Sequence, residues 1–369
     1  MINENSQYNL WFASIEGMSY TRAKSILKFF ENPKEVYLST DSLLRATGLD
    51  FSEKIIKAKN TSPSYYVNLL KEKNIRFTSI WDNDYPTQLK NIYNPPVGLY
   101  SIGKLSFSDL KNQDYPNISV VGSRQCSDYG ILTTLKIARF LASKNIIVIS
   151  GMALGIDTYA HKGVLEEKGI TIAVLGCGVD ICYPKGNFYL YEKIKETGVI
   201  LSEYVPGSAP KTFHFPMRNR IISGLSQATV VVEAGIKSGS LITADCALEQ
   251  GKDVFSVPGN ITSTLSSGTN NLIKQGAYIL TDPNEILETL NILYTKKPII
   301  KEEKPNTNID DLTPEEKTII SCLTESPIEI DEIHRKTLLD MQILNYNLTM
   351  LELKGILKRL PGNKYAIDF

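Results

Sequence analysis

The sequence predicts an α/β protein built around an extended Rossmann-like, doubly wound parallel sheet, with a small helical domain before it and a winged-helix domain after it. Between residues 117 and 258, short runs rich in Val and Ile alternate with helical segments of moderate length. Such alternation is typical of parallel strands joined by right-handed crossovers. Each run is also followed by a loop of unusual composition, mostly rich in glycine. We therefore expect a ligand-binding edge at the carboxyl ends of the strands.

Composition limits the classes of protein that fit. The 369 residues suffice for two or three domains, and 40 basic and 40 acidic side chains cancel to a formal net charge of zero. No global field then attracts nucleic acid or a membrane, so such affinity must come from a local patch. The longest apolar runs are only of strand length, and the first ten residues lack the pattern of a signal peptide. We expect a cytoplasmic protein without a membrane span.

The five cysteines are odd in number and include no CxxC pair, and the three histidines lie in separate segments. We therefore expect reduced thiols, no metal site and no cofactor. The cysteines are Cys126, Cys177, Cys182, Cys246 and Cys322.

Residues 1–75 have a helical pattern. Two similar phrases, IEGMSYTRAKSILKFF from Ile15 and LLRATGLDFSEKIIKAK from Leu43, each place a glycine before a basic amphipathic helix. Helix-hairpin-helix or SAM-like modules have this pattern, and hairpin N–H groups can hold a DNA phosphate. The loose glycine spacing favours the simpler interpretation, a small bundle whose glycines end helices.

The domain after it is predicted to span residues 76–295 and begins with a proline-marked connector. Pro95 and Pro96 exclude a helix there, so we expect an edge strand that joins the sheet. The parallel strands follow as the runs ISVV from Ile118, IIVIS from Ile146, TIAVL from Thr171, VILS from Val199, TVVVEA from Thr229 and DVFSV from Asp253.

The first of these strands leads into Gly122, Ser123 and Arg124, and an amphipathic helix begins near Asp128. A tight turn before a helix presents free backbone N–H groups to an anion, and an arginine adds a planar fork of donors suited to phosphate. The loop therefore predicts a phosphate cradle. A dinucleotide enzyme would need GxGxxG here and an acid after the second strand, which instead ends in Ser150 and Gly151.

Basic and aromatic residues are interleaved in the next loops. YPKGN contains Lys185, and KTFHFPMRNR contains Lys211, Phe213, Arg218 and Arg220. This mixture suits single-stranded nucleic acid, whose phosphates need cations and whose unstacked bases can lie on rings. Lysines in glycine or proline loops have no structural task, which favours a binding role for Lys185 and Lys211. Arg218 and Arg220 fit phosphate contacts and buried ion pairs equally well.

A polar, proline-containing linker is predicted over residues 296–312, followed by a winged-helix domain over residues 313–369. Thr313 suits an N-cap with Pro314 at the first helical position. The candidate recognition helix from Met341 is mostly apolar and poor in Arg and Lys. We therefore expect a structural or protein-contact role there rather than DNA reading, since a duplex-reading helix needs base-edge and phosphate donors.

Several phrases together resemble the DNA processing protein A (DprA) family over roughly residues 80–290. They are GSR at Gly122, SGMALGID at Ser150, LGCGVDICYPKGN at Leu175, FPMRNRIISGLS at Phe215, EAGIKSGSLITADCALEQGKDVFSVPGN at Glu233 and the following GTNNLIKQGA. The helical and winged-helix flanks resemble that family's three-part layout.

The resemblance implies a non-enzymatic protein of natural transformation that binds incoming single-stranded DNA and forms a homodimer. It also implies loading of the RecA recombinase, with single-strand-binding protein as a further candidate partner. By motif, the family's DNA contacts map onto Arg124, Lys185, Lys211 and Phe213. The same matching extends to Ser123, Asn187 and Arg218.

Two other classes of function remain open at the level of the sequence. Glu233 beside the loop 235–240 could be the base of a nucleotide-cleaving enzyme of phosphoribohydrolase type, although a lone acid after a strand is more often structural. Asp157 is better interpreted as a residue that braces its loop. A transcription factor acting through the winged helix is the third class.

Overall fold

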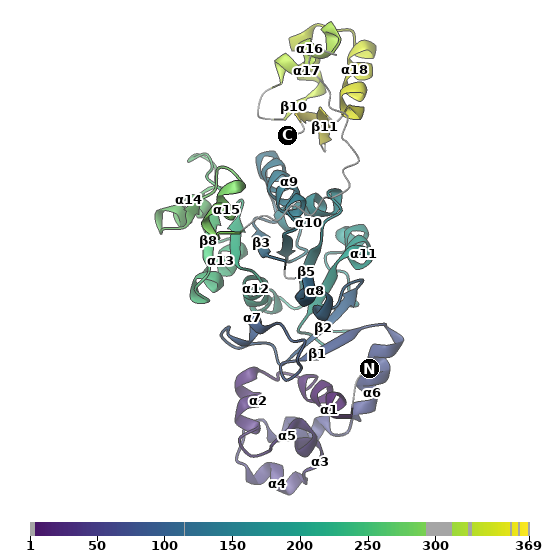
Figure 1. Cartoon of the computed structure of the whole chain (residues 1–369), viewed down its shortest axis with the longest axis vertical. Helices are drawn as coiled ribbons and strands as arrows, with labels where there is room; N and C mark the ends of the chain where they lie inside the picture. The colour runs from purple at the N-terminus through teal and green to yellow at the C-terminus, as the bar shows by residue number, and fades with distance from the viewer. Residues whose placement is uncertain are drawn as a thin grey trace. The chain divides into compact units, whose positions relative to one another are not determined.

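The computed structural model describes most of the chain and divides it into two compact units, Met1–Ile292 and Leu293–Phe369 (Figure 1). The predicted linker lies, except for Leu312, outside the described residues. Within those residues, no helix combines the length and the apolar character needed to cross a membrane. All five cysteines have free thiols. The described residues are 4–113, 115–292, 312–323, 327–354, 356–360 and 362–367.

The chain begins with a cluster of short helices around the buried side chains of Trp11, Ile26, Leu44 and Ile55. Gly48 has a φ of +67°, which favours glycine, and its N–H donates to Arg45 O at 3.1 Å just after the fourth helix. This glycine therefore ends a helix. The helices are α1 (Glu4–Ala13), α2 (Tyr20–Ile26), α3 (Pro33–Leu38), α4 (Asp41–Ala46), α5 (Ser52–Ala58) and α6 (Pro63–Glu72).

A nine-stranded sheet follows, in the order β1-β2-β6-β5-β4-β3-β7-β8-β9. All neighbours from β6 to β9 pair in parallel, and β1 and β2 add an antiparallel edge. The doubly wound parallel sheet is thus confirmed. The strands are β1 (Arg76–Ser79), β2 (Gly98–Gly103), β3 (Asn117–Val121), β4 (Ile147–Ser150), β5 (Thr171–Leu175), β6 (Val199–Ser202), β7 (Ala228–Val231), β8 (Asp253–Ser256) and β9 (Tyr278–Ile279).

Helices cover both faces of this sheet because its strands carry apolar side chains on both sides. In β4, Val148 belongs to the same hydrophobic cluster as side chains of α9 and α10, whereas Ile147 and Ile149 belong to the cluster with α12 and α13. The helices are α7 (Thr87–Lys90), α8 (Phe107–Gln113), α9 (Asp128–Ser143), α10 (Ile156–Glu166), α11 (Phe188–Thr197), α12 (His214–Leu225), α13 (Gly239–Glu249), α14 (Ser267–Lys274) and α15 (Asn284–Thr289).

The connector contributes more strand than the sequence predicts. It supplies two strands, β1 and β2, which pair with each other from Arg76 opposite Ser101 to Ser79 opposite Gly98. β2 then pairs with β6 in the opposite direction to the parallel core. The sheet therefore begins within the connector, next to the N-terminal helices.

The second unit has the predicted winged-helix elements. Thr313 and Glu316 form a reciprocal capping box, and Pro314 occupies the first helical turn. A three-stranded sheet in the order β10-β12-β11 closes the unit. The elements are α16 (Pro314–Cys322), β10 (Ile328–Glu329), α17 (Ile330–Thr337), α18 (Met341–Leu353), β11 (Leu357–Leu360) and β12 (Lys364–Ile367).

One buried histidine lies where α10 packs on the sheet. His161 Nδ1 is 2.7 Å from Thr171 Oγ1, whose hydroxyl donates to Val148 O at 2.8 Å. Since that hydroxyl proton is committed, Nδ1 must be the donor to Thr171, and Nε2 carries the lone pair. Nε2 is buried and has no partner among the described residues. Burial, helped by the positive charge of Arg218, lowers the pKa of His161 to about 3.

This histidine should make stability depend on pH. Because the folded pKa lies below the unfolded value, stability is full above about pH 6.5 and falls as the unfolded chain takes up the proton alone. We expect the free energy of unfolding to fall by about 1.4 kcal/mol at pH 5.5 from this group. Urea denaturation at pH 5.5 and at a pH well above 6.5, followed by the fluorescence of Trp11 and Trp81, measures this loss for the first unit. His161→Gln should lose less, and an equal loss in variant and wild type would contradict the assignment.

Candidate nucleic-acid interface

The loops after the parallel strands meet at one edge of the sheet and enclose a cavity of about 810 Å³. It lies beside the point where the strand order reverses, with β4 on one side of β3 and β7 on the other. Ligands of open α/β sheets bind at such a position. Its wall includes Arg124 after β3, Leu154 after β4, Tyr183 after β5, Phe215 and Arg218 of α12 and Ser238 before α13.

The loop after β3 is held by the loop after β7. A Cβ on Gly122 would lie 2.6 Å from Ile156 Cγ1 and 2.9 Å from Glu233 O, so only glycine allows this approach. Ser123 N donates to Glu233 O at 2.7 Å. The Glu233 carboxylate accepts from Ser127 N at 2.8 Å and from its hydroxyl at 2.5 Å. Glu233, which is 2% exposed, therefore braces the loop that presents Arg124.

Arg124 is exposed at the tip of this loop. Its guanidinium carbon lies 5.4 Å from the centre of the Phe215 ring, and that ring lies 5.5 Å from the ring of Tyr183 at an interplanar angle of 33°. A cation over an aromatic ring is held by the ring quadrupole and keeps its outer donors for a ligand. The three side chains form a wall that offers both charge and ring faces.

Ser123 is partly exposed, but its hydroxyl is used inside its own turn. It donates to Gln125 O at 2.8 Å and accepts from Gln125 N at 3.2 Å. The structure therefore places Ser123 beside Arg124 as a residue that shapes the loop.

Lys185 and Asn187 lie in one 3₁₀ turn, Lys185–Asn187, but face opposite environments. Lys185 is exposed. Asn187 is 5% exposed, and its Nδ2 lies 3.0 Å from Met152 O and 2.9 Å from Thr158 Oγ1. Lys185 therefore lies on the surface, whereas the hydrogen bonds of Asn187 hold the turn against the loop after β4.

Lys211 and Phe213 stand just before α12. Both side chains are exposed, Phe213 to 63%, and Lys211 Nζ lies 6.0 Å from the centre of the Phe213 ring. The next residue, His214, turns inward, stacks on Tyr204 at 3.7 Å and approaches Gly176 O through Nδ1 at 3.0 Å. Because His214 anchors the helix start, Phe213 is left with its ring in solvent.

Arg218 is buried beneath the same loops, with 4% of its surface exposed. Its Nη1 donates to Gly151 O at 2.6 Å and to Val174 O, at the ends of β4 and β5. The nearby Asp157 carboxylate accepts from Gly151 N at 3.1 Å and Ala153 N at 3.3 Å. Burial raises the pKa of Asp157, while the charge of Arg218 acts in the opposite direction. Arg218 lines the cavity and also holds its floor.

Arg220 is the other arginine whose role, phosphate contact or buried ion pair, the sequence leaves undecided. It pairs with Glu203 at 2.7 Å in a largely buried position.

By contrast, no ion pair among the described residues involves Arg124, Lys185 or Lys211. Three exposed cations are therefore available to an anionic ligand, and the loops that carry them border or adjoin one cavity.

Sequence reasoning missed the placement of two parts of this wall. Phe215, rather than Phe213, has its ring against Arg124 and Tyr183. Ser238 caps α13, with its hydroxyl accepting from Ser240 N at 3.4 Å, and also lines the cavity. The run of small residues SGS was the available signal for the second feature. No signal separates Phe213 from Phe215, which are two residues apart.

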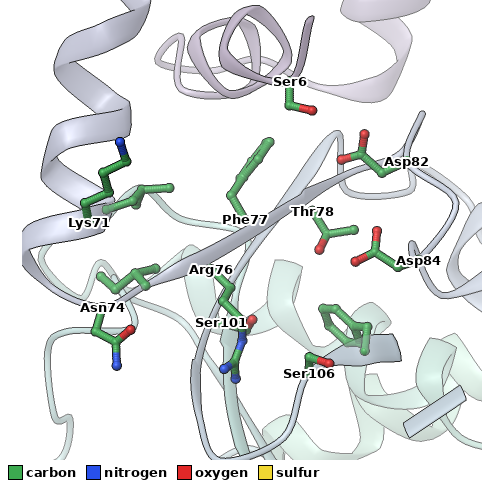
Figure 2. Close-up of a pocket in the computed structure, with 13 residues that line it drawn as sticks. Ser6, Lys71, Asn74, Arg76, Phe77, Thr78, Asp82, Asp84, Ser101 and Ser106 are labelled. Atoms are coloured by element: carbon green, nitrogen blue, oxygen red, sulfur yellow. The ribbon is translucent and has the colours of Figure 1, made fainter. Parts of the chain in front are cut away.

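A second cavity, of about 510 Å³, lies where α1 and α6 meet β1 (Figure 2). Its wall mixes cations and anions, with Lys71 and Arg76 together with Asp82 and Asp84. Arg76 Nη2 is already engaged by Gly103 O at 2.8 Å. Mixed charge does not match a chain of phosphates, so the first cavity is the better candidate for a nucleic-acid site.

Within the described residues, no group of three or more His, Cys, Asp or Glu side chains could hold a metal ion. The wall of the central cavity contains arginine side chains and aromatic rings. The fold and this edge define a Rossmann-type protein whose exposed loop cations border or adjoin a cavity at the carboxyl ends of the strands.

Comparison with known proteins places the chain more closely. Residues 76–291 match the family model described as DNA recombination-mediator protein A, and residues 303–363 match the DprA winged helix domain. Because the first match covers more than half of the chain, the chain belongs to the DNA processing protein A (DprA) family.

Individual relatives agree with this assignment. Protein Smf of Synechocystis sp. is 34% identical over 99% of both chains. DNA processing protein DprA of Streptococcus pneumoniae is 46% identical over 57% of this chain and 72% of its own length. A crystal structure of DprA from Streptococcus pneumoniae has a TM-score of 0.64 and 36% identity, and covers 78% of this chain and 98% of that one.

A solved structure of DNA processing protein A from Helicobacter pylori, which concerns its single-stranded DNA binding mode, is also similar. It has a TM-score of 0.53 and 30% identity, and covers 60% of this chain and 98% of that one.

The buried and exposed residues of the YPKGN loop should differ in their effect on stability. Asn187→Ala leaves the backbone oxygen of Met152 and the hydroxyl of Thr158 without their donor and should cost roughly 1–3 kcal/mol of unfolding free energy. Lys185→Ala removes an exposed side chain and should stay within about 0.5 kcal/mol of the wild type. Urea denaturation of the two variants tests this, and equal effects would show that Asn187 does not brace the loop.

Proposed function

We propose that this protein binds single-stranded DNA without sequence preference at the carboxyl edge of its sheet and acts as a recombination mediator. One observation carries the proposal: exposed Arg124, Lys185 and Lys211, with no ion-pair partner among the described residues, lie in loops around a cavity walled by aromatic rings. Cations neutralise the backbone, and rings accept any base, since every base has a π-face. Membership of a recombination-mediator family, with a relative described in terms of single-stranded DNA binding, supports the same assignment.

In this proposal Arg124, Lys185 and Lys211 contact phosphates and Phe213 stacks on a base. Ser123, Asn187 and Arg218 shape the site, with Arg218 also within reach of a ligand in the cavity. No step of covalent chemistry is assigned to any residue. The bound strand is then handed to a RecA-type recombinase during natural transformation, with the protein acting as a homodimer and meeting single-strand-binding protein on the same strand.

Apolar side chains near the far edge of the sheet offer a surface for the dimer. Leu248 of α13 is exposed, as are Tyr278 and Ile279 of the edge strand β9. An edge strand with exposed apolar side chains is a favourable place for a second copy to pair.

The enzyme alternative has less support from the geometry. A general base must reach its substrate, but the Glu233 carboxylate is buried and both its oxygens accept hydrogen bonds from Ser127. Glu233 is also not among the residues that line the cavity. Incubation with nucleoside monophosphates should therefore release no free base, and released base would favour the alternative.

The third class of function, a transcription factor acting through the winged helix, can also be tested. α18 contains no Lys or Arg, and Met341, Ile343 and Tyr346 are exposed on it. Phosphate contacts need cations, so this helix does not suit a duplex. Removal of residues 300–369 should leave single-strand binding within about two-fold of the full chain, a difference of only about 0.4 kcal/mol.

Charge and ring contributions should separate in a salt titration. Lys211→Ala removes one phosphate contact and should lower the slope of log affinity against log salt by about 0.7. Phe213→Ala should weaken binding roughly ten-fold or more with little change in slope, because stacking is not ionic. Fluorescence anisotropy with labelled oligothymidylate measures both. Lys104→Ala is the matched control, because Lys104 is exposed and follows β2 at the opposite edge of the sheet, where Gly103 pairs with Val199 at the start of β6. Equal slopes for Lys211→Ala and wild type would remove Lys211 from the site.

Mediation needs its own assay. The protein should shorten the lag of recombinase filament assembly on strands already coated by single-strand-binding protein. The reason is that this protein and single-strand-binding protein compete for the same bases. Lys211→Ala should lengthen that lag in proportion to its lost affinity. Filament assembly that is unchanged by the wild-type protein would contradict the mediator role while leaving strand binding intact.

A further inference from the structure

Two large aromatic side chains lie on the surface at the start of α11. Phe188 is 59% exposed and the adjacent Tyr189 is 75% exposed. Single exposed aromatic residues are ordinary, and two consecutive ones beside a basic loop call for a reason. They follow Lys185 by three and four residues, so the loop that carries one of the exposed cations continues directly into them.

The rings are held outward by the rest of their helix. Leu190 and Tyr191 turn inward, and the Tyr191 hydroxyl donates to Val179 O at 2.6 Å. On the other side, Asn187 fastens the preceding turn to the loop after β4. Because both flanks are fixed, neither Phe188 nor Tyr189 can turn into the core, and their positions exist before any ligand binds.

A short stretch of chain joins the pair to the wall of the central cavity. Tyr183 lines that cavity, and its ring packs against Phe215. Lys185 stands two residues further on and is exposed. One short stretch of chain therefore leads from the cavity wall, past a cation, to two further rings.

Charge favours a nucleic-acid occupant. Lys193 Nζ lies 5.8 Å from the centre of the Tyr189 ring and also contacts Glu196 at 2.8 Å. Lys193 is thus already paired with an acid, and Lys185 is the cation beside the rings that has no ion-pair partner among the described residues. A cation next to exposed rings is typical of sites that follow a single strand, where cations track the backbone and rings accept bases. A duplex would hide its base faces in its own stack, so these rings suit unpaired bases.

We propose that Phe188 and Tyr189 form a second stacking platform, which takes the bases of a single strand after it leaves the central cavity on the Tyr183 side. The inference rests on the proposed function and extends it. The binding site is then longer than the cavity, and only strands long enough to reach α11 contact its outer part.

The test compares two lengths of oligothymidylate. We take about 6 and about 20 nucleotides, because known single-strand sites occupy roughly 4–16 nucleotides per domain. The double variant Phe188→Ala/Tyr189→Ala should bind the long strand roughly ten-fold or more weakly and the short strand within about two-fold of the wild type. Phe188→Trp/Tyr189→Phe, which keeps both ring faces, should restore the affinity for the long strand. Tyr93→Ala, an exposed ring elsewhere in the same unit, is the matched control.

The outcomes separate the two claims. If the wild type binds neither strand, the proposed function itself fails. If the wild type binds both strands and the double variant matches it on both, or loses both equally, the platform is refuted and strand binding stands. Light scattering gives a further readout: loss of self-association in the double variant, without loss of long-strand affinity, would assign the rings to a second copy of the chain and overturn the platform.

Discussion

The candidate site depends on a buried cation that joins the ends of two parallel strands. Arg218 donates to Gly151 O just after β4 and to Val174 O near the end of β5. It lies next to Asp157, whose carboxylate accepts from two N–H groups of the loop after β4. An unpaired buried charge would be strongly destabilising, so the arginine, the carboxylate and the two strand ends must be ordered together. The exposed cations are displayed on loops that this network and Glu233 hold in place. The surface chemistry therefore rests on polar contacts beneath it.

The parallel core could be predicted from the sequence because its strands are buried on both faces. Such strands read as continuous runs of Val and Ile, and each predicted run corresponds to one of β3 to β8. The edges of the sheet were harder to predict from the sequence. β9 is two residues long, and β1 and β2 come from a proline-marked connector, so pairing with the existing sheet rather than local preference decides their conformation.

The residues of the candidate site also divide into those that the sequence could place and those that it could not. Arg124, Lys185 and Lys211 could be placed on the surface because cations in glycine and proline loops have no partner nearby in the sequence. Asn187 and Arg218 stand in the same loops, but burial depends on segments distant in the sequence, here the loop after β4, and no local pattern reveals it. For the same reason the sequence could not tell which ring, Phe213 or Phe215, would face the cavity. That choice is made by His214, whose contact with Gly176 fixes where α12 begins.

Hydrogen bonds between side chains and the backbone hold the loops around the cavity in place. This order affects how fast and how selectively the proposed single-stranded ligand can bind. A site that is already ordered in the free protein spends no binding free energy on freezing its loops, so the loss of freedom falls on the flexible strand alone. With a net charge of zero there is also little long-range attraction, and encounter depends on the few exposed cations near the cavity. For the proposed function, most of the binding free energy would then come from short-range contacts with unpaired bases and phosphates rather than from long-range attraction.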